Sequence, residues 1–147
     1  MSIFDTRYLT LAEKIEIGAM STICPHKAGY GVILIIFSSE HNPPHFHVFK
    51  AASGRRCLCR YVLTLDRPKS VQDLIPLKGD TDLPRRDKAA IVEWAKAQYK
   101  DTNYTNWKHA QYTWEDEADT DIEMEFPTIR DAKDGKIYQK KNPTAKG

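Results

Sequence analysis

The strongest constraint on the fold is an apolar, β-branched run that is followed by two consecutive prolines. Residues 30–37 (Tyr-Gly-Val-Ile-Leu-Ile-Ile-Phe) are apolar almost throughout, which predicts a strand buried on both faces. Pro43 and Pro44 then interrupt the chain, because proline fixes φ and has no backbone N–H to donate. Residues 45–50 and 57–64 follow as two further strands joined by a turn. Such a chain is expected to fold as a sheet of hairpins.

Two helix-periodic segments come after these strands. Pro84 and Asp87 favour a helix start, and the spacing of the apolar residues predicts helices near 84–99 and 104–117. Residues 70–77 and 121–126 are candidates for additional strands, the second because its apolar residues alternate strictly. Strands before helices, with a late returning strand, predict an α+β domain. Its mostly antiparallel sheet is expected to be covered on one face by the helices.

The length of 147 residues fits one folded domain. We place this domain at residues 30–126. Residues 1–29 form an N-terminal extension in which an apolar stripe predicts a short helix. Residues 127–147 form a polar, basic tail.

The net charge is small for the whole chain but not for its parts. There are 22 Lys and Arg residues against 20 Asp and Glu, which gives a net charge of +2. Residues 45–108 hold 13 basic and 7 acidic side chains, whereas residues 115–125 hold 7 acidic and no basic ones. The basic and acidic stretches either pair with each other or present two surfaces to different partners.

The cysteine pattern and the hydropathy of the sequence indicate the cellular compartment in which the protein is expected. Cys24, Cys57 and Cys59 cannot all pair within one chain, and neighbours two residues apart in a strand seldom reach disulfide geometry. We therefore predict a reducing, cytoplasmic setting without a disulfide framework. The longest apolar run, residues 32–37, is far shorter than the ~18 residues of a membrane span. No signal-peptide pattern opens the sequence, and we expect no membrane partner.

Three of the five histidines, His41, His45 and His47, fall within seven positions as H-x-x-x-H-x-H. In a strand, His45 and His47 point to the same face, and this spacing suits transition metals such as zinc. His41 could fold back across the prolines as a third ligand. The three histidines are therefore the candidates for a metal site and for catalysis.

The register of the 45–64 hairpin decides whether cysteines join these histidines. If the turn centres near Ser53, His47 lies opposite Cys59 and Cys57 shares the same face, whereas a slip of one residue removes both cysteines from it. Equally, the imidazoles can be corner residues that hydrogen-bond backbone carbonyls without any metal. The sequence has no P-loop, dinucleotide-binding, G-x-S-x-G or H-E-x-x-H motif, so any catalysis depends on the histidines.

A second candidate site is basic. Arg55, Arg56 and Arg60 flank the hairpin, and Arg85 and Arg86 open the 84–99 helix. This pattern predicts an anion or nucleic-acid site, since free N–H groups at a helix N-terminus and guanidinium groups both bind phosphate. The alternative is that the arginines pair with the acidic stretch. Aromatic residues that could stack on bases, although helix-spaced aromatics are usually core, are Tyr61, Trp94, Tyr99, Trp107, Tyr112 and Trp114.

Residues 40–48 (Glu-His-Asn-Pro-Pro-His-Phe-His-Val) resemble the hallmark of a family of small, uncharacterised bacterial domains, an acidic residue followed by H-x-P-P-H-F-H. Residues 83–86, 92–95 and 106–107 extend the resemblance in the expected order. Members are usually shorter, so residues 1–29 and the tail are additions, and the cysteines are not part of the pattern. The matching positions are His41, Pro43, Pro44, His45, Phe46, His47, Arg85, Arg86, Glu93, Trp94 and Trp107.

The resemblance implies a toxin-like role. Members are often encoded beside another small protein, and the two together look like a toxin–antitoxin pair. We therefore expect a component that binds a small cognate protein, with RNA as a further target. Two alternatives remain open. One is a metal-dependent hydrolase or nuclease that uses His41, His45 and His47, and the other is a non-catalytic structural or regulatory module.

Overall fold

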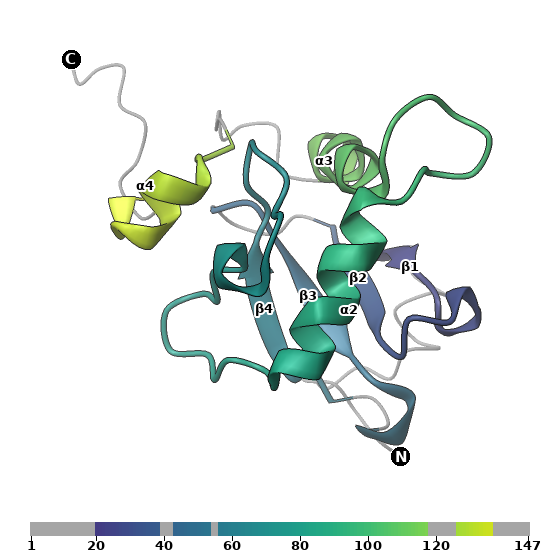
Figure 1. The fold of residues 1–147 in the computed structure, drawn as a ribbon, viewed down its shortest axis with the longest axis horizontal. Helices are drawn as coiled ribbons and strands as arrows, with labels where there is room; N and C mark the ends of the chain where they lie inside the picture. Colours follow the sequence, from purple (N-terminus) through teal and green to yellow (C-terminus); the bar gives the residue numbers. More distant parts are fainter. Residues whose placement is uncertain (1–19, 39–42, 54–55, 118–125, 137–147) are drawn as a thin grey trace.

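In the computed structural model, four antiparallel strands form one sheet with two helices packed on one face (Figure 1). The structure describes residues 20–38, 43–53, 56–117 and 126–136. The predicted α+β architecture is therefore confirmed. The strands, whose order in the sheet follows the chain, are β1 (Met20–Cys24), β2 (Ile33–Phe37), β3 (His45–Phe49) and β4 (Cys59–Val62). The helices packed on the sheet are α2 (Arg85–Lys96) and α3 (Asn106–Glu117).

The first strand lies in a segment that sequence patterning placed outside the sheet. β1 belongs to residues 1–29 and pairs with β2 in antiparallel register, with Met20 opposite Phe37 and Thr22 opposite Ile35. Its five residues, Met-Ser-Thr-Ile-Cys, carry little alternation, and only the pairing with β2 makes them a strand. The predicted helix in this extension falls at residues outside the described part of the chain. Residues 1–29 are thus not wholly peripheral to the sheet.

A tight connection explains why β2 starts later than expected. A short 3-10 helix, His26–Ala28, is followed by Gly29 and Gly31, which have φ values of +88° and +81°. Such left-handed backbone is readily adopted only by glycine, and it prevents residues 30–32 from continuing the strand. β2 therefore begins at Ile33 rather than at Tyr30.

The strand expected at residues 70–77 is wrong in its first half. Val71–Asp73 form a 3-10 helix, because the Asp73 carboxylate accepts hydrogen bonds from the backbone N–H groups of Lys69 and Ser70. The second half makes only a single bridge to β4, between Pro76 and Tyr61. Two hydrogen bonds flank this bridge, from the Val62 N–H to the Ile75 carbonyl and from the Leu77 N–H to the Arg60 carbonyl, each at 2.9 Å.

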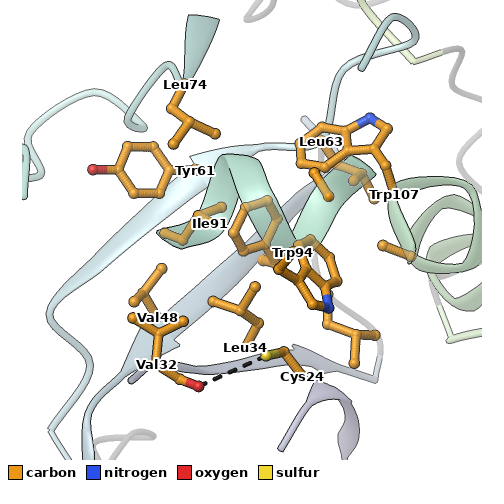
Figure 2. Close-up of a cluster of buried hydrophobic side chains, with 14 of the residues drawn as sticks. Cys24, Val32, Leu34, Val48, Tyr61, Leu63, Leu74, Ile91, Trp94 and Trp107 are labelled. Carbon is orange, nitrogen blue, oxygen red and sulfur yellow. Dashed lines mark hydrogen bonds between the residues drawn. The ribbon is translucent and has the colours of Figure 1, made fainter. Parts of the chain in front are cut away.

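The core lies between the sheet and the two helices (Figure 2). Phe46 of β3 is fully buried, and its ring centroid lies 6.3 Å from that of Trp94 and 5.7 Å from that of Trp107. The Trp107 indole N–H donates to the Thr64 carbonyl at 2.9 Å, and the Gln111 amide donates to the same oxygen at 2.8 Å. Phe46 and both tryptophans are therefore packing residues.

The beginning of the tail is attached to the domain. A short helix, α4 (Ile129–Lys133), lies beside β4 in Figure 1, and its Ala132 packs with Val62 and Leu77. The Asp66 carboxylate accepts a hydrogen bond from the Ile129 N–H at 2.8 Å. Of the strand predicted at 121–126, only Phe126 is described, and it packs against the main core.

Candidate functional site

The register of the β3–β4 hairpin separates the histidines from one of the cysteines. His47 lies opposite Arg60, and Val48 lies opposite Cys59, so Cys59 shares the face of the core. Of the two registers left open, the one shifted by one residue is therefore observed, and it removes Cys59 but not Cys57 from the histidines. The physical reason is that the connection contains a 3-10 turn, Ala51–Ser53, which moves the centre of the hairpin beyond Ser53.

Cys57 does meet a histidine, on the face of the sheet away from α2 and α3. Its Sγ atom lies 3.6 Å from Nδ1 of His47, and it packs against the apolar cluster of that face around Phe49. The ring centroids of His47 and His45 are 5.2 Å apart. Among the described side chains, then, these two histidines and Cys57 are neighbours.

His45 is held as a corner residue. It is buried, its Nδ1 lies 2.8 Å from the Pro43 carbonyl, and its ring centroid is 5.4 Å from that of Trp114. Because a carbonyl only accepts, Nδ1 carries a proton and donates in this contact. A hydrogen bond to a backbone carbonyl is what the interpretation without a metal predicts for this imidazole. Metal-bound imidazoles also form such a hydrogen bond through their second ring nitrogen.

No three His, Cys, Asp or Glu side chains within the described ranges are grouped so that they could hold a metal ion. His41 lies outside these ranges, so the three-histidine site remains a prediction. Elemental analysis of protein purified without a histidine tag would test it.

The cysteines are poor nucleophiles in this fold. Burial raises the pKa of the Cys57 thiol to about 11, although hydrogen bonding to the backbone of Cys59 and Val48 opposes the effect. Burial also raises the pKa of Cys24 and of Cys59 to about 12. Because the thiolate is the reactive form, these groups are essentially unreactive at neutral pH. The contact between Cys57 and His47 is therefore not an activated catalytic pair.

Arg60 of the predicted anion site is already paired. Its backbone N–H, Nε and Nη2 donate to the Asp80 carboxylate at 2.8, 3.0 and 2.8 Å. Burial alone would raise the pKa of Asp80, but the hydrogen bonds from Arg60 outweigh it and hold that pKa below its ordinary value. Arg56 lies exposed nearby, and Arg55 is outside the described residues.

Arg85 and Arg86 are different, because both are exposed and neither forms an ion pair within the described part of the chain. They are the first two residues of α2, and Pro84 before them has no side chain that can cap the helix. The carboxylates near these two arginines are already paired with lysines. Asp87 binds Lys50 at 3.1 Å, Asp82 binds Lys88 at 2.7 Å, and Glu93 binds Lys96 at 3.2 Å.

The aromatic residues divide into two groups. Tyr61 of β4 is buried in the core, and so are Trp94, Trp107 and Trp114, as helix spacing predicts for these three. Tyr99 and Tyr112 instead join a second group at the connection between α2 and α3. We call this group, Tyr99, Tyr104, His109 and Tyr112, the tyrosine cluster.

The tyrosine cluster is continuous and bears two lysines. His109 stacks on Tyr99 with 3.6 Å between centroids, Tyr104 lies parallel to Tyr99 at 5.9 Å, and Tyr112 meets Tyr104 edge-on at 5.3 Å. The Nζ atoms of Lys100 and Lys108 lie 5.2 Å from the ring centroids of Tyr99 and Tyr112. Sequence reasoning named two of these tyrosines but missed the group. The recurrence of tyrosine and lysine over residues 99–112 is the signal that could have shown it.

The sequence pattern of the domain of unknown function DUF4160 matches residues 31–108, more than half of the chain. This protein belongs to the DUF4160 family. No curated protein and no solved structure matches it. The DUF4160 region contains Arg85, Arg86, Tyr99 and Tyr104, whereas Tyr112 lies just beyond its end. No helix of the described residues is long and apolar enough to span a membrane.

Proposed function

We propose that this DUF4160 protein is the toxin-like component of a bacterial two-protein, toxin–antitoxin-like pair, and that it acts by binding RNA. The observation that carries the proposal is the distribution of ion pairs around α2. The carboxylates of Asp82, Asp87 and Glu93 are each bound to a lysine, whereas Arg85 and Arg86 have no ion-pair partner among the described residues. The helix therefore presents unneutralised positive charge.

Further cations continue this charge at the other end of α2. Lys100 follows the helix, Lys108 lies in the first turn of α3, and neither forms an ion pair within the described ranges. A helix of 12 residues is about 18 Å long. A flexible polyanion can contact cations that are spread over such a distance, and single-stranded RNA is a polyanion of that kind.

The chemistry of the cysteines also favours binding over covalent catalysis. The pKa of Cys57 is about 11, so its thiol stays protonated beside His47. A role in which the protein binds RNA requires no nucleophile. The structural and regulatory alternative differs from this proposal in predicting no salt-sensitive affinity for RNA.

Binding of a labelled RNA of about 12 nucleotides tests the proposal. We expect Arg85→Ala combined with Arg86→Ala to weaken binding and to lower the dependence of log K on log salt by about 1.4, or about 0.7 for each lost phosphate contact. Lys96→Ala is the matched control, because Lys96 is exposed on the same helix but is paired with Glu93. Equal losses in the two variants would contradict the proposed site.

Pairing with a small cognate protein is the second part of the proposal, and the outer edge of β1 favours it. β1 is the terminal strand of the sheet, and no described strand pairs with its outer side. An extended segment of a partner could add a strand there. We expect co-expression with the neighbouring gene product to give a stable complex in which hydrogen exchange slows at Met20–Cys24. A complex protected only elsewhere would exclude this edge.

A further inference from the structure

We propose that the tyrosine cluster is a stacking platform for the bases of single-stranded RNA. This inference rests on the proposed RNA-binding function and adds the site and the kind of RNA. The cluster lies at the connection between α2 and α3, which projects away from the sheet in Figure 1. Tyr112 is 43% exposed, although a ring of that size is usually covered in a folded domain. Its exposure leaves aromatic surface for a ligand.

The connection that carries the cluster is closed by hydrogen bonds. The Tyr99 N–H donates to the Tyr104 carbonyl at 2.9 Å, the Asn106 N–H donates to the Ala97 carbonyl at 2.8 Å, and the Thr102 hydroxyl donates to the Tyr99 carbonyl at 2.6 Å. These contacts fix the backbone that carries Tyr99 and Tyr104 before any ligand arrives, which lowers the entropic cost of binding. A preformed aromatic surface of this kind is what stacking of unpaired bases requires.

The lysines make the platform selective for an anionic aromatic ligand. Lys100 lies over Tyr99 and Lys108 over Tyr112, each with Nζ 5.2 Å from the ring centroid. Tyr99 is already stacked on His109, so the base stacks on the exposed Tyr112, where its phosphate lies near the ammonium group of Lys108. Duplex RNA cannot use both features, because its bases are already stacked and paired.

The acidic residues near the cluster set the side on which the phosphate lies. Glu115 and Asp116 are exposed on the turn of α3 that follows Tyr112, whereas Asp101 is the exposed acidic residue beside Lys100. The two carboxylates on α3 repel phosphate, so the phosphate of a base on Tyr112 lies on the side of Lys108.

The test uses the full-length chain and three probes of about equal length: oligoadenylate RNA, a perfect RNA duplex, and inorganic polyphosphate, which has the charge but no bases. Tyr112→Leu is expected to weaken oligoadenylate binding roughly 10-fold and to leave polyphosphate binding unchanged. Tyr112→Trp keeps the stacking surface and should keep the affinity. Lys108→Gln should weaken both single-stranded RNA and polyphosphate. Duplex RNA should bind more weakly than oligoadenylate.

The outcomes separate this inference from the proposed function. If Tyr112→Leu binds oligoadenylate like the wild type while the Arg85 and Arg86 double variant loses affinity, RNA binding stands and the platform is overturned. If Tyr112→Leu weakens only the complex with the cognate protein, the cluster is a protein-docking surface and the platform is again overturned. If the wild type binds no RNA, the proposed function itself fails. Circular dichroism confirms that each variant is folded.

Discussion

The imidazole of His109 lies parallel to the phenol ring of Tyr99, with 3.6 Å between the ring centroids and 9° between the planes. The contact joins the first turns of α3 to the residues that follow α2. It therefore positions the tyrosine cluster and adds to the packing of the two helices, which also meet through Trp94 and Trp107. The stack of His109 on Tyr99 thus contributes both to the stability of the fold and to the arrangement of the candidate RNA platform.

The stack of His109 on Tyr99 predicts that the free energy of unfolding depends on pH. Burial and the nearby charge of Lys100 both lower the pKa of His109, so the folded protein favours the neutral imidazole. The unfolded chain then binds the proton more readily, and the free energy of unfolding must fall as pH drops below about 6.5. Urea titrations across this range should show a smaller decline for His109→Phe than for the wild type. Identical pH profiles would show that His109 does not contribute.

The pair of Arg60 and Asp80 predicts a further loss of stability at a lower pH. Because the folded pKa of Asp80 lies below its ordinary 3.8, this contribution is complete above that value and is lost as pH falls through the folded pKa. Asp80→Asn is expected to lower the free energy of unfolding by about 1–2 kcal/mol at neutral pH. Asp101→Asn is a suitable control, since Asp101 is exposed. Equal stability of the two variants would contradict the assignment.

Cysteine labelling tests the interpretation that Cys57 is not an activated nucleophile. With a pKa of about 11, Cys57 should react with iodoacetamide at neutral pH roughly 100-fold more slowly than a small free thiol. Cys24 and Cys59 are buried and should react more slowly still. Mass spectrometry of the native protein over time would measure the order. Fast labelling of Cys57 that is lost in His47→Ala would instead indicate a working Cys–His pair.

Trp107 and Gln111 of α3 share the Thr64 carbonyl as an acceptor, so we expect the effects of substituting them on stability to be coupled. This carbonyl accepts hydrogen bonds from Trp107 and from Gln111, and it is buried. Trp107→Phe should cost about 2 kcal/mol and Gln111→Leu about 1 kcal/mol. The double variant should cost more than the two together, because it removes both donors from a buried acceptor. Additive losses in chemical denaturation would show that the carbonyl finds another partner.

The parts of the fold that follow local periodicity could be predicted from the sequence. The apolar run of β2 and the helix-spaced residues of α2 mark their own elements, and burial of Trp94 and Trp107 follows from the same spacing. β1 was missed because its pattern is weak and its pairing with β2 is a long-range contact. The β3–β4 register stayed open between two alternatives because the 3-10 turn before residue 54 is not visible in a strand pattern.

The candidate site could also be predicted only in part, because some of its contacts form only in the tertiary structure. Arg60 and Asp80 are 20 residues apart, and their pairing, which removes Arg60 from the anion site, depends on tertiary structure. Arg85 and Arg86 could be identified, since a helix start exposes its first residues. For the tyrosine cluster the sequence offers only the recurrence of tyrosine and lysine, because the stack of Tyr99 on His109 depends on how residues 97–105 fold back.

The most direct test of the central claim is the salt dependence of RNA binding by the wild-type protein. Four cations, Arg85, Arg86, Lys100 and Lys108, each in contact with one phosphate, predict a log–log slope of about −2.8 for single-stranded RNA. Affinity should therefore fall roughly 50-fold between about 50 mM and about 200 mM monovalent salt. An affinity that does not change with salt, or an absence of binding at the lower concentration, would contradict the account.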